Sequence, residues 1–174
     1  MDRRIEVIVA DITTLKLDAI VNAANSALLG GGGVDGAIHR KAGPRLLAHC
    51  LTLGGCSAGE AKISPGFDLP AKFVIHTVGP VWSGGNNHED KVLAACYRRS
   101  LEVALDNGVR TIAFPAISTG AYRFPAGQAA KIAVRTVSRV IAGDDRIDRV
   151  QFCCFSTAAA DMVSARLSAL EPTP

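Results

Sequence analysis

The chain lacks the long apolar segments that mark membrane and secreted proteins. No apolar run in its 174 residues approaches the roughly 20 residues that a membrane-spanning helix needs. The first residues, Met1 to Glu6, also lack the apolar region of a signal peptide. We therefore expect a cytoplasmic protein that has no membrane partner.

Metal-binding and disulfide patterns are also missing. The 5 cysteines are odd in number and lie mostly within apolar stretches, which is typical of reduced, buried thiols. No C-x-x-C or H-x-x-x-H spacing occurs, and the 4 histidines form no ligand pattern. The sequence therefore predicts no resident metal or cofactor and no disulfide framework.

The net charge of the chain is small. A formal charge of +3 at pH 7 modestly favours an anionic ligand. It is too small to indicate a nucleic-acid partner, and neither a basic stripe nor an aromatic platform accompanies it. We therefore do not expect direct binding to nucleic acid.

The composition and length suit one globular domain. A domain of this size buries roughly 70% of its unfolded surface, and 48% hydrophobic with 20% charged residues is an ordinary composition for a folded chain. The sequence contains no internal repeat, linker or second domain. Residues 1–174 are therefore predicted to form a single domain, with a core from about residue 4 to about residue 170.

Hydrophobic periodicity indicates strands that alternate with helices. The predicted strands span residues 4–10, 18–22, 60–64, 72–78, 111–114 and 149–155. The first two predicted helices are 34–42 and a short helix that begins at Pro44. A third is capped by Asn87 and ended by Gly108, a fourth spans 126–142, and a fifth runs from its cap Thr157 to about Leu170. Residues 171–174 are predicted to form a frayed end. This alternation predicts a three-layer α/β/α domain, but it does not predict the order of the strands.

One stretch, residues 22–39, concentrates amides, glycines and an acid. Asn22 and Asn25 lie at the end of an apolar strand, where α/β folds place their sites. The glycine run that follows leads into a helix, so it offers free backbone N–H groups and a positive dipole end to an anion. Its residues are Gly31, Gly32, Gly33 and Val34. Asp35 in the first turn would be a carboxylate beside that anion, although the helix dipole alone also favours an acid there.

A second loop, residues 116–124, follows another predicted strand and Pro115. The hydroxyl and N–H groups of Ser118, Thr119 and Gly120 stand beside two aromatic residues, which makes this loop a second candidate for phosphate binding. A plain connection between a strand and a helix would use the same residue types. Both interpretations stay open on this pattern alone.

Three residues in or after strands have two interpretations each. Asp11 follows the first strand and suits a turn or a cap as well as a ligand contact. Phe155 ends the last strand and is either a core residue or a platform for a ligand ring. His76 lies inside an apolar strand, where a histidine is more often a hydrogen-bonded core residue than a base.

Three segments together carry a family resemblance. Asn22-Ala-Ala-Asn25, Gly31-Gly-Gly-Val-Asp-Gly-Ala-Ile-His39 and Phe114-Pro-Ala-Ile-Ser-Thr-Gly-Ala-Tyr122 resemble signature segments of the macrodomain family. The closest likeness is to the branch with O-acetyl-ADP-ribose deacetylase and mono-ADP-ribosyl hydrolase activity, and it runs from about Arg4 to about Leu170. The resemblance implies a mixed, mainly parallel sheet of six or seven strands, with a cleft over the strand ends.

The resemblance also implies roles for individual residues. Asp11 and the backbone of Ile12 would contact adenine, and Phe155 would be the platform beneath it. The diphosphate would be bound by Gly31, Gly32, Gly33 and Val34 and by the loop of Ser118, Thr119, Gly120 and Ala121, while Tyr122 would shield the distal ribose. Gly120 should admit no side chain, because its backbone would approach the diphosphate closely and such glycines often need a positive φ.

Two functions from different classes fit this resemblance. In the first, a hydrolase, Asp35 acts as general base, directly or by positioning a water, and Asn25 orients a ribose hydroxyl without any metal. The substrate would be O-acetyl-ADP-ribose or a protein that carries ADP-ribose on an acidic side chain. In the second, a binding module reads ADP-ribose without turning it over. Binding-only relatives often lack the acid at the Asp35 position, so Asp35 together with Asn25 favours the enzyme.

Overall fold

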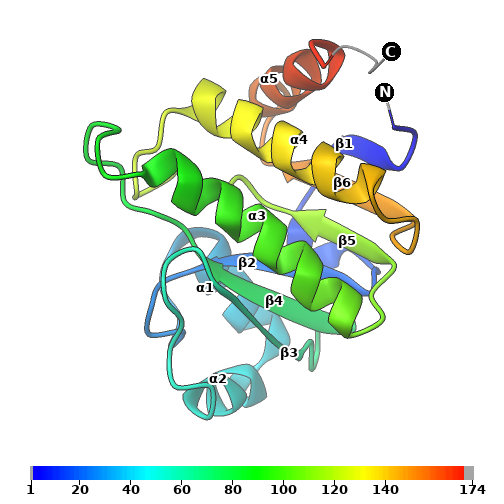
Figure 1. Cartoon of the computed structure of the whole chain (residues 1–174). Helices are drawn as coiled ribbons and strands as arrows, with labels where there is room; N and C mark the ends of the chain where they lie inside the picture. Colours follow the sequence, from blue (N-terminus) through cyan, green and yellow to red (C-terminus); the bar gives the residue numbers. More distant parts are fainter. Residues whose placement is uncertain (1, 171–174) are drawn as a thin grey trace.

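A six-stranded sheet forms the centre of the computed structural model, which describes residues 2–170 (Figure 1). The strands are β1 (Ile5–Val9), β2 (Ala19–Ala24), β3 (Ala61–Pro65), β4 (Phe73–Val78), β5 (Thr111–Phe114) and β6 (Arg149–Cys154). Their order in the sheet is β1-β6-β5-β2-β4-β3, and every neighbouring pair is parallel except β3 with β4. The prediction of a mixed, mainly parallel sheet is confirmed.

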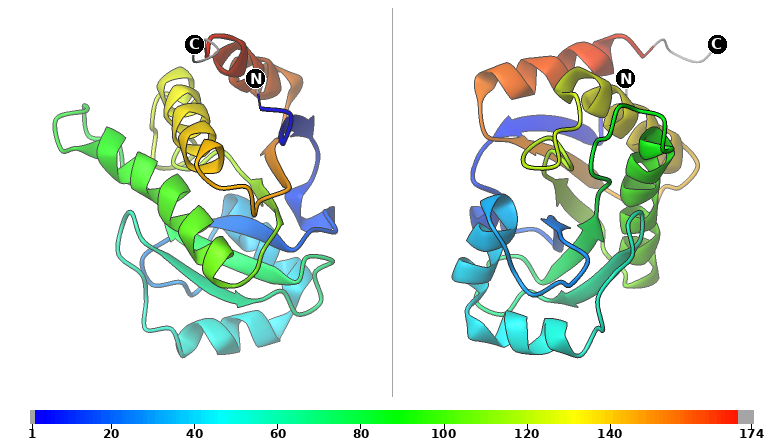
Figure 2. Two further views of the ribbon diagram at one scale, coloured as in Figure 1. Left: turned by 45° about the vertical axis from the view of Figure 1, so that its right-hand side comes forward. Right: turned by 90° about the vertical axis from the view of Figure 1, so that its left-hand side faces the viewer.

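Helices cover both faces of this sheet, which gives the predicted three layers. They are α1 (Gly33–Ala42), α2 (Pro44–Leu51), α3 (Glu89–Asp106), α4 (Ala126–Ala142) and α5 (Thr157–Ser168), with a short 3-10 helix η1 (Ile12–Thr14). Figure 1 shows α3 and α4 in front of the sheet and α1 behind it, and Figure 2 shows the same layers from the side. None of the helices between residues 2 and 170 combines the length and apolar character of a bilayer span.

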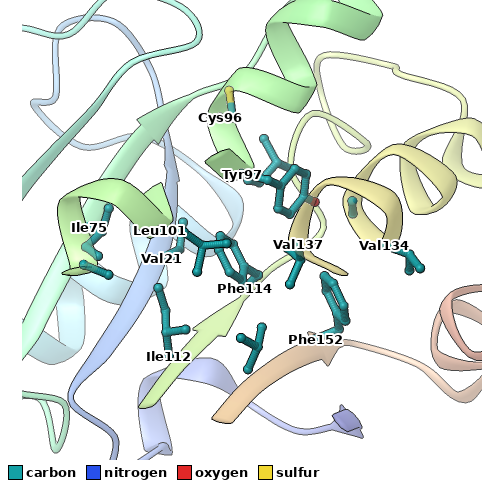
Figure 3. Close-up of a cluster of buried hydrophobic side chains, with 14 of the residues drawn as sticks. Val21, Ile75, Cys96, Tyr97, Leu101, Ile112, Phe114, Val134, Val137 and Phe152 are labelled. Carbon is teal, nitrogen blue, oxygen red and sulfur yellow. The ribbon is translucent and has the colours of Figure 1, made fainter. Parts of the chain in front are cut away.

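The alternation of side chains along β2 divides the core in two. Val21 points into the cluster under α3 and α4, which also contains Ile75 and Phe114 (Figure 3). Its neighbour Ile20 points to the opposite face, into a second cluster under α1 and α2. Each fully buried aliphatic side chain contributes about 1.5–3 kcal/mol of transfer free energy, so both faces hold helices firmly. All 5 cysteines are buried and free, as predicted.

The start of α3 differs from the sequence-based prediction. Asn87 does not cap the helix, which begins at Glu89 after His88, a residue in the left-handed region with φ 58°. The buried Glu89 carboxylate instead accepts from the backbone N–H groups of Ser83, Gly85 and Asn87, at 2.9, 2.8 and 2.6 Å. These backbone donors lower the pKa of Glu89 to about 2. One carboxylate therefore satisfies the loop before the helix, and no side-chain cap is needed.

Two other helix boundaries also needed the structure. The cap of α5 is Ser156, whose hydroxyl accepts from the N–H of Ala159, and the predicted cap Thr157 is the first helical residue. The 3-10 helix η1 was not predicted, because a single turn is too short to show periodicity. The frayed end predicted at 171–174 lies outside the described residues.

Candidate active site

A cavity of about 450 Å³ opens where the parallel strands end. Because β1, β6, β5, β2 and β4 all run in the same direction, the loops that follow them meet at one edge of the sheet. Two of these loops carry the glycine-rich and the Ser-Thr-Gly segments. The predicted site residues that line the cavity are Asn25, Gly31, Gly32, Gly33, Val34, Asp35, Ser118, Thr119, Gly120, Ala121, Tyr122 and Phe155.

Asp35 is a buried residue that lines this cavity. It is in the first turn of α1 and only 4% of its surface is exposed. Its Oδ1 accepts a 2.8 Å hydrogen bond from Nδ2 of Asn22 and lies 3.4 Å from Nε2 of His39, one turn further along the helix. The helix dipole stabilises an acid in the first turn even when that acid is exposed, so the dipole alone does not explain why Asp35 is buried. Burial in a cavity wall therefore favours a functional carboxylate.

Asn25 and Asp35 lie on either side of the position that a Cβ of Gly31 would occupy. Its Nδ2 donates to the carbonyl of Gly30 at 3.0 Å, and its Oδ1 accepts from the N–H of Leu28 at 3.2 Å. A Cβ at Gly31 would lie 3.1 Å from Oδ2 of Asp35 and 3.3 Å from Nδ2 of Asn25. The missing side chain at Gly31 therefore leaves the space that a ligand needs between the amide and the carboxylate.

The start of α1 presents backbone donors to the cavity. Gly32 is the N-cap residue, and no side chain caps the helix. The unpaired N–H groups of a first helical turn, together with the helix dipole, form a site that favours phosphate. Gly31, Gly33 and Gly36 also match the letters G-x-G-x-x-G, but the strand order here is not the 3-2-1-4-5-6 order of dinucleotide-binding sheets.

The loop after β5 has a constrained backbone. Ser118 is buried in the left-handed region with φ 65°, and its carbonyl accepts from the N–H of Phe124 at 2.9 Å, which closes the loop. Such a conformation in a residue other than glycine costs of the order of 1–3 kcal/mol and is concentrated at binding sites. Gly120 differs from the prediction in one respect. Its φ is not positive, and a Cβ there would meet nothing within 4 Å, so only a bound ligand could exclude a side chain.

Tyr122 is held at the cavity by the neighbouring loop. Its carbonyl accepts from the N–H of Trp82 at 2.8 Å, and the Trp82 ring packs on Phe124 with centroids 4.8 Å apart. The loop that carries Trp82 is the one that Glu89 organises through three backbone hydrogen bonds. Glu89 thus supports one wall of the cavity from outside it.

Asp11 and Ile12 do not line the cavity, in contrast to the other predicted residues. Oδ1 of Asp11 accepts from the hydroxyl and N–H of Thr13, at 2.7 and 3.0 Å, and these two bonds lower the pKa of Asp11. Ile12 is buried in the core cluster under α1 and α2. The structure therefore shows the capping interpretation of Asp11, and the contact of these two residues with adenine stays a prediction.

The structure distinguishes between the two interpretations of Phe155, a core residue or a platform for a ligand ring. It is 73% exposed and lines the cavity, so it is not a core residue. An exposed aromatic ring at the mouth of a cavity offers a flat apolar surface to a ligand ring. The structure therefore retains the platform interpretation.

Two buried residues near Asp35 have no functional role in the sequence-based prediction. Asn22 and His76 are both completely buried, and Nδ2 of Asn22 lies 3.1 Å from Nδ1 of His76. Burial lowers the pKa of His76 to about 3, aided by the charges of His39 and His49. The prediction that His76 is a hydrogen-bonded core residue is confirmed, but its partner connects it to Asp35. Within residues 2–170, no group of three His, Cys, Asp or Glu side chains is placed to hold a metal ion.

Known proteins share this sequence over nearly its whole length. Residues 21–133 match the Macro domain family. A macro domain-containing protein of Chlorobaculum tepidum is 60% identical over 165 residues, which are 95% of this chain and 96% of that protein. A protein of Enterobacter sp. (strain 638) named O-acetyl-ADP-ribose deacetylase is 51% identical, with 100% of this chain and 99% of that protein covered.

A solved structure shares the fold as well. The Oceanobacillus iheyensis macrodomain with ADP matches with a TM-score of 0.90 and 42% identity, over 95% of this chain and 90% of that chain. Sequence, strand arrangement and the motifs around the cavity therefore agree on one assignment, and the chain belongs to the Macro domain family.

Proposed function

We propose that this chain binds ADP-ribose esters in the cavity and hydrolyses them. The substrates would be O-acetyl-ADP-ribose and proteins that carry ADP-ribose on an acidic side chain. The observation that carries the proposal is the buried Asp35 carboxylate, which faces Asn25 across the empty Cβ position of Gly31. The relative named O-acetyl-ADP-ribose deacetylase supports the hydrolysis, and the solved macrodomain with ADP supports the binding.

Binding would use backbone donors and one aromatic ring. The start of α1 and the loop of Ser118, Thr119 and Gly120 both line the cavity, and we propose that the N–H groups of both segments bind the diphosphate. Phe155 would lie under the adenine, and Tyr122 would cover the distal ribose. Because the protein supplies fixed dipoles for the diphosphate charge, we propose that hydrolysis needs no metal.

In the proposed reaction, Asp35 takes a proton from a water as the water oxygen attacks the ester carbonyl. The bond between the carbonyl carbon and the ribose oxygen then breaks, and the proton passes to that oxygen. The products are ADP-ribose and a free carboxylic acid. Asn25 would hold the adjacent ribose hydroxyl through its remaining amide hydrogen, which orients the ester toward Asp35.

Single and double variants test this mechanism. Asp35→Ala should lower kcat for O-acetyl-ADP-ribose by about 10² to 10⁴, as for loss of a general base, while calorimetry shows little change in ADP-ribose affinity. Asn25→Ala should also lose most activity, and the double variant should be little worse than the poorer single variant, because residues that act together are not additive. Hydrolysis at the wild-type rate by Asp35→Ala would instead mean that a different group acts as the base.

The two ester classes are separated by a product assay. The wild-type protein would be incubated with O-acetyl-ADP-ribose and, in parallel, with a protein that carries ADP-ribose on a glutamate. We expect release of acetate in the first reaction and of ADP-ribose in the second. Turnover of only one ester would restrict the proposal to that substrate, and turnover of neither with intact ADP-ribose binding would favour the binding module.

A further inference from the structure

A line of buried polar side chains crosses the face of the sheet that α1 and α2 cover. Ser64 on β3, His76 on β4 and Asn22 on β2 come from three neighbouring strands. His76 is paired in register with Asn22, and none of the three is more than 1% exposed. A buried polar group without a hydrogen bond costs about 1–3 kcal/mol, so a line of three in an apolar layer calls for a reason.

The hydrogen bonds along this line have one direction only. With Asp35 ionised, as its proposed role as base requires, Oδ1 can only accept, so the Asn22 atom at 2.8 Å must be the amide nitrogen. The same nitrogen lies 3.1 Å from Nδ1 of His76, so its second hydrogen is bonded only if Nδ1 carries no proton. The proton of His76 is then on Nε2, 2.9 Å from the hydroxyl of Ser64, and that hydroxyl donates to the carbonyl of Pro65 at 3.2 Å.

The other ring forms of His76 would break this line. A ring that carries its proton on Nδ1 would place a donor against the amide donor of Asn22. A doubly protonated ring would do the same, and burial disfavours it by lowering the pKa of His76 to about 3. Ser64 favours the required form, because its hydroxyl donates to Pro65 and is left to accept from Nε2. Cys50 is the other neighbour of Nε2, but its sulfur is 3.9 Å away.

The consequence reaches the carboxylate. With Oδ1 of Asp35 bound to Asn22, the oxygen left for the ligand is Oδ2, which borders the Cβ position of Gly31. We infer that His76, supported by Ser64, is a positioning residue for hydrolysis: it fixes the Asn22 amide, and the amide fixes the rotation of the Asp35 carboxylate. This inference rests on the proposed function, because it gives Asp35 the role of base.

Variants of His76 separate positioning from folding. His76→Leu removes the hydrogen bonds to Asn22 and Ser64 and replaces the ring with an apolar side chain of similar size. His76→Asn places an acceptor near the position of Nδ1 and restores the bond to Asn22. We expect His76→Leu to lower kcat by about tenfold or more, less than the 10² to 10⁴ of a lost base, with ADP-ribose affinity within about twofold of wild type. His76→Asn should recover most of that loss.

A matched control comes from the same strand. Thr77 is also completely buried, and its hydroxyl donates to the carbonyl of Glu60 at 2.9 Å, on the opposite face of the sheet. Thr77→Val therefore removes a buried hydrogen bond from β4 without touching the line to Asp35. It should leave kcat unchanged. If Thr77→Val lowers kcat as much as His76→Leu does, general loosening of β4 explains the result and the inference is overturned.

A variant of Ser64 tests the same line without changing His76. Ser64→Ala removes the oxygen acceptor of the Nε2 proton, so this hydrogen would have only the sulfur of Cys50, 3.9 Å from Nε2, as a neighbour. NMR of the ¹⁵N-labelled histidine ring should show a single form with the proton on Nε2 in the wild type, and a mixture of both forms in Ser64→Ala together with a lower kcat. This variant also carries the test if His76→Leu does not fold. A wild-type ring with its proton on Nδ1 would overturn the inference.

The double variant with Asp35 distinguishes the inference from the proposed function. If His76 acts through Asp35, then adding His76→Leu to Asp35→Ala should cause no further loss of rate. A further loss by the same factor as in the wild type would show that His76 acts elsewhere and would overturn the inference alone. A wild-type rate for Asp35→Ala would overturn the role of Asp35 as base in the proposed function, whereas an inactive Asp35→Ala with a fully active, folded His76→Leu would overturn only the positioning role.

Discussion

Replacing Phe155 by alanine should weaken ADP-ribose binding by about 10- to 40-fold. An aromatic side chain buries about 150–250 Å² when fully covered, and Phe155 is 73% exposed, so about 110–180 Å² is free. A base lying flat on one face would cover about half of that area. At about 25 cal/mol per Å², the contact is worth about 1.4–2.2 kcal/mol, within the about 1–3 kcal/mol found for stacking of bases on aromatic residues.

Calorimetry with wild type, Phe155→Ala and Phe155→Trp measures this contribution. Phe155→Trp keeps a flat ring and should bind nearly as well as wild type. The melting temperature of Phe155→Ala should barely change, because substitutions at exposed positions are usually within about 0.5 kcal/mol of wild type. Leu51→Ala is the matched control, since Leu51 is a large apolar residue that is 62% exposed but does not line the cavity.

A ligand without the base provides the second control. Ribose 5-diphosphate keeps the anionic part of the ligand, so its affinity should be the same for wild type and Phe155→Ala. An equal loss of affinity for both ligands would mean that the ring supports the diphosphate loops instead of the adenine. Unchanged ADP-ribose affinity in Phe155→Ala would refute the platform role and the area argument together.

Three further results are expected. Chelation with EDTA should leave the rate of ester hydrolysis unchanged, and a rate that disappears and returns with added zinc or magnesium would refute the metal-free mechanism. Gly120→Val should fold with a wild-type melting temperature but bind ADP-ribose at least tenfold more weakly by calorimetry, because its Cβ has free space only while no ligand is present. Glu89→Gln should lower the free energy of unfolding, measured by urea titration, above about pH 5. Because the pKa of Glu89 falls from 4.5 to about 2 on folding, the difference in stability from wild type should shrink as the pH falls from about 4.5 towards about 2. A difference that stays constant down to pH 2 would contradict the role of the carboxylate.

Local patterns predicted most of the fold. Strand 72–78 and helix 126–142 were placed within a residue of β4 and α4, because long apolar or amphipathic runs carry their own period. The errors lie at helix starts, at the missed η1 and at the end of β2, which continues to Ala24 and not only to the predicted Asn22. Asn87 is a good cap residue by type, but the carboxylate of Glu89 binds three backbone N–H groups of the same loop and determines where the helix begins. Residue type alone cannot decide such a competition between two nearby caps.

The candidate site divides in the same way. Residues that belong to one continuous segment, such as Gly31 to Asp35 and Ser118 to Tyr122, are adjacent in the sequence and line the cavity together. Phe155 needed the structure, because exposure depends on which loops surround the end of β6. For Asp11 the deciding contact is local, because Oδ1 of its carboxylate accepts hydrogen bonds from the nearby Thr13. The cytoplasmic location and the role of Asp11 with adenine stay predictions.

The line from Ser64 to Asp35 shows where such inference ends. Each member has an ordinary explanation in its own segment: a serine on an edge strand, a histidine inside an apolar strand, an asparagine at a strand end and an acid in a first turn. They meet only because β3 pairs antiparallel with β4 while β4 pairs parallel with β2, which brings Ser64, His76 and Asn22 onto one face of the sheet. Periodicity does not predict that pairing. A buried histidine in an apolar strand is therefore best interpreted after the strand order is known. The strand order shows which polar group can donate a hydrogen bond to the unprotonated nitrogen of its neutral ring.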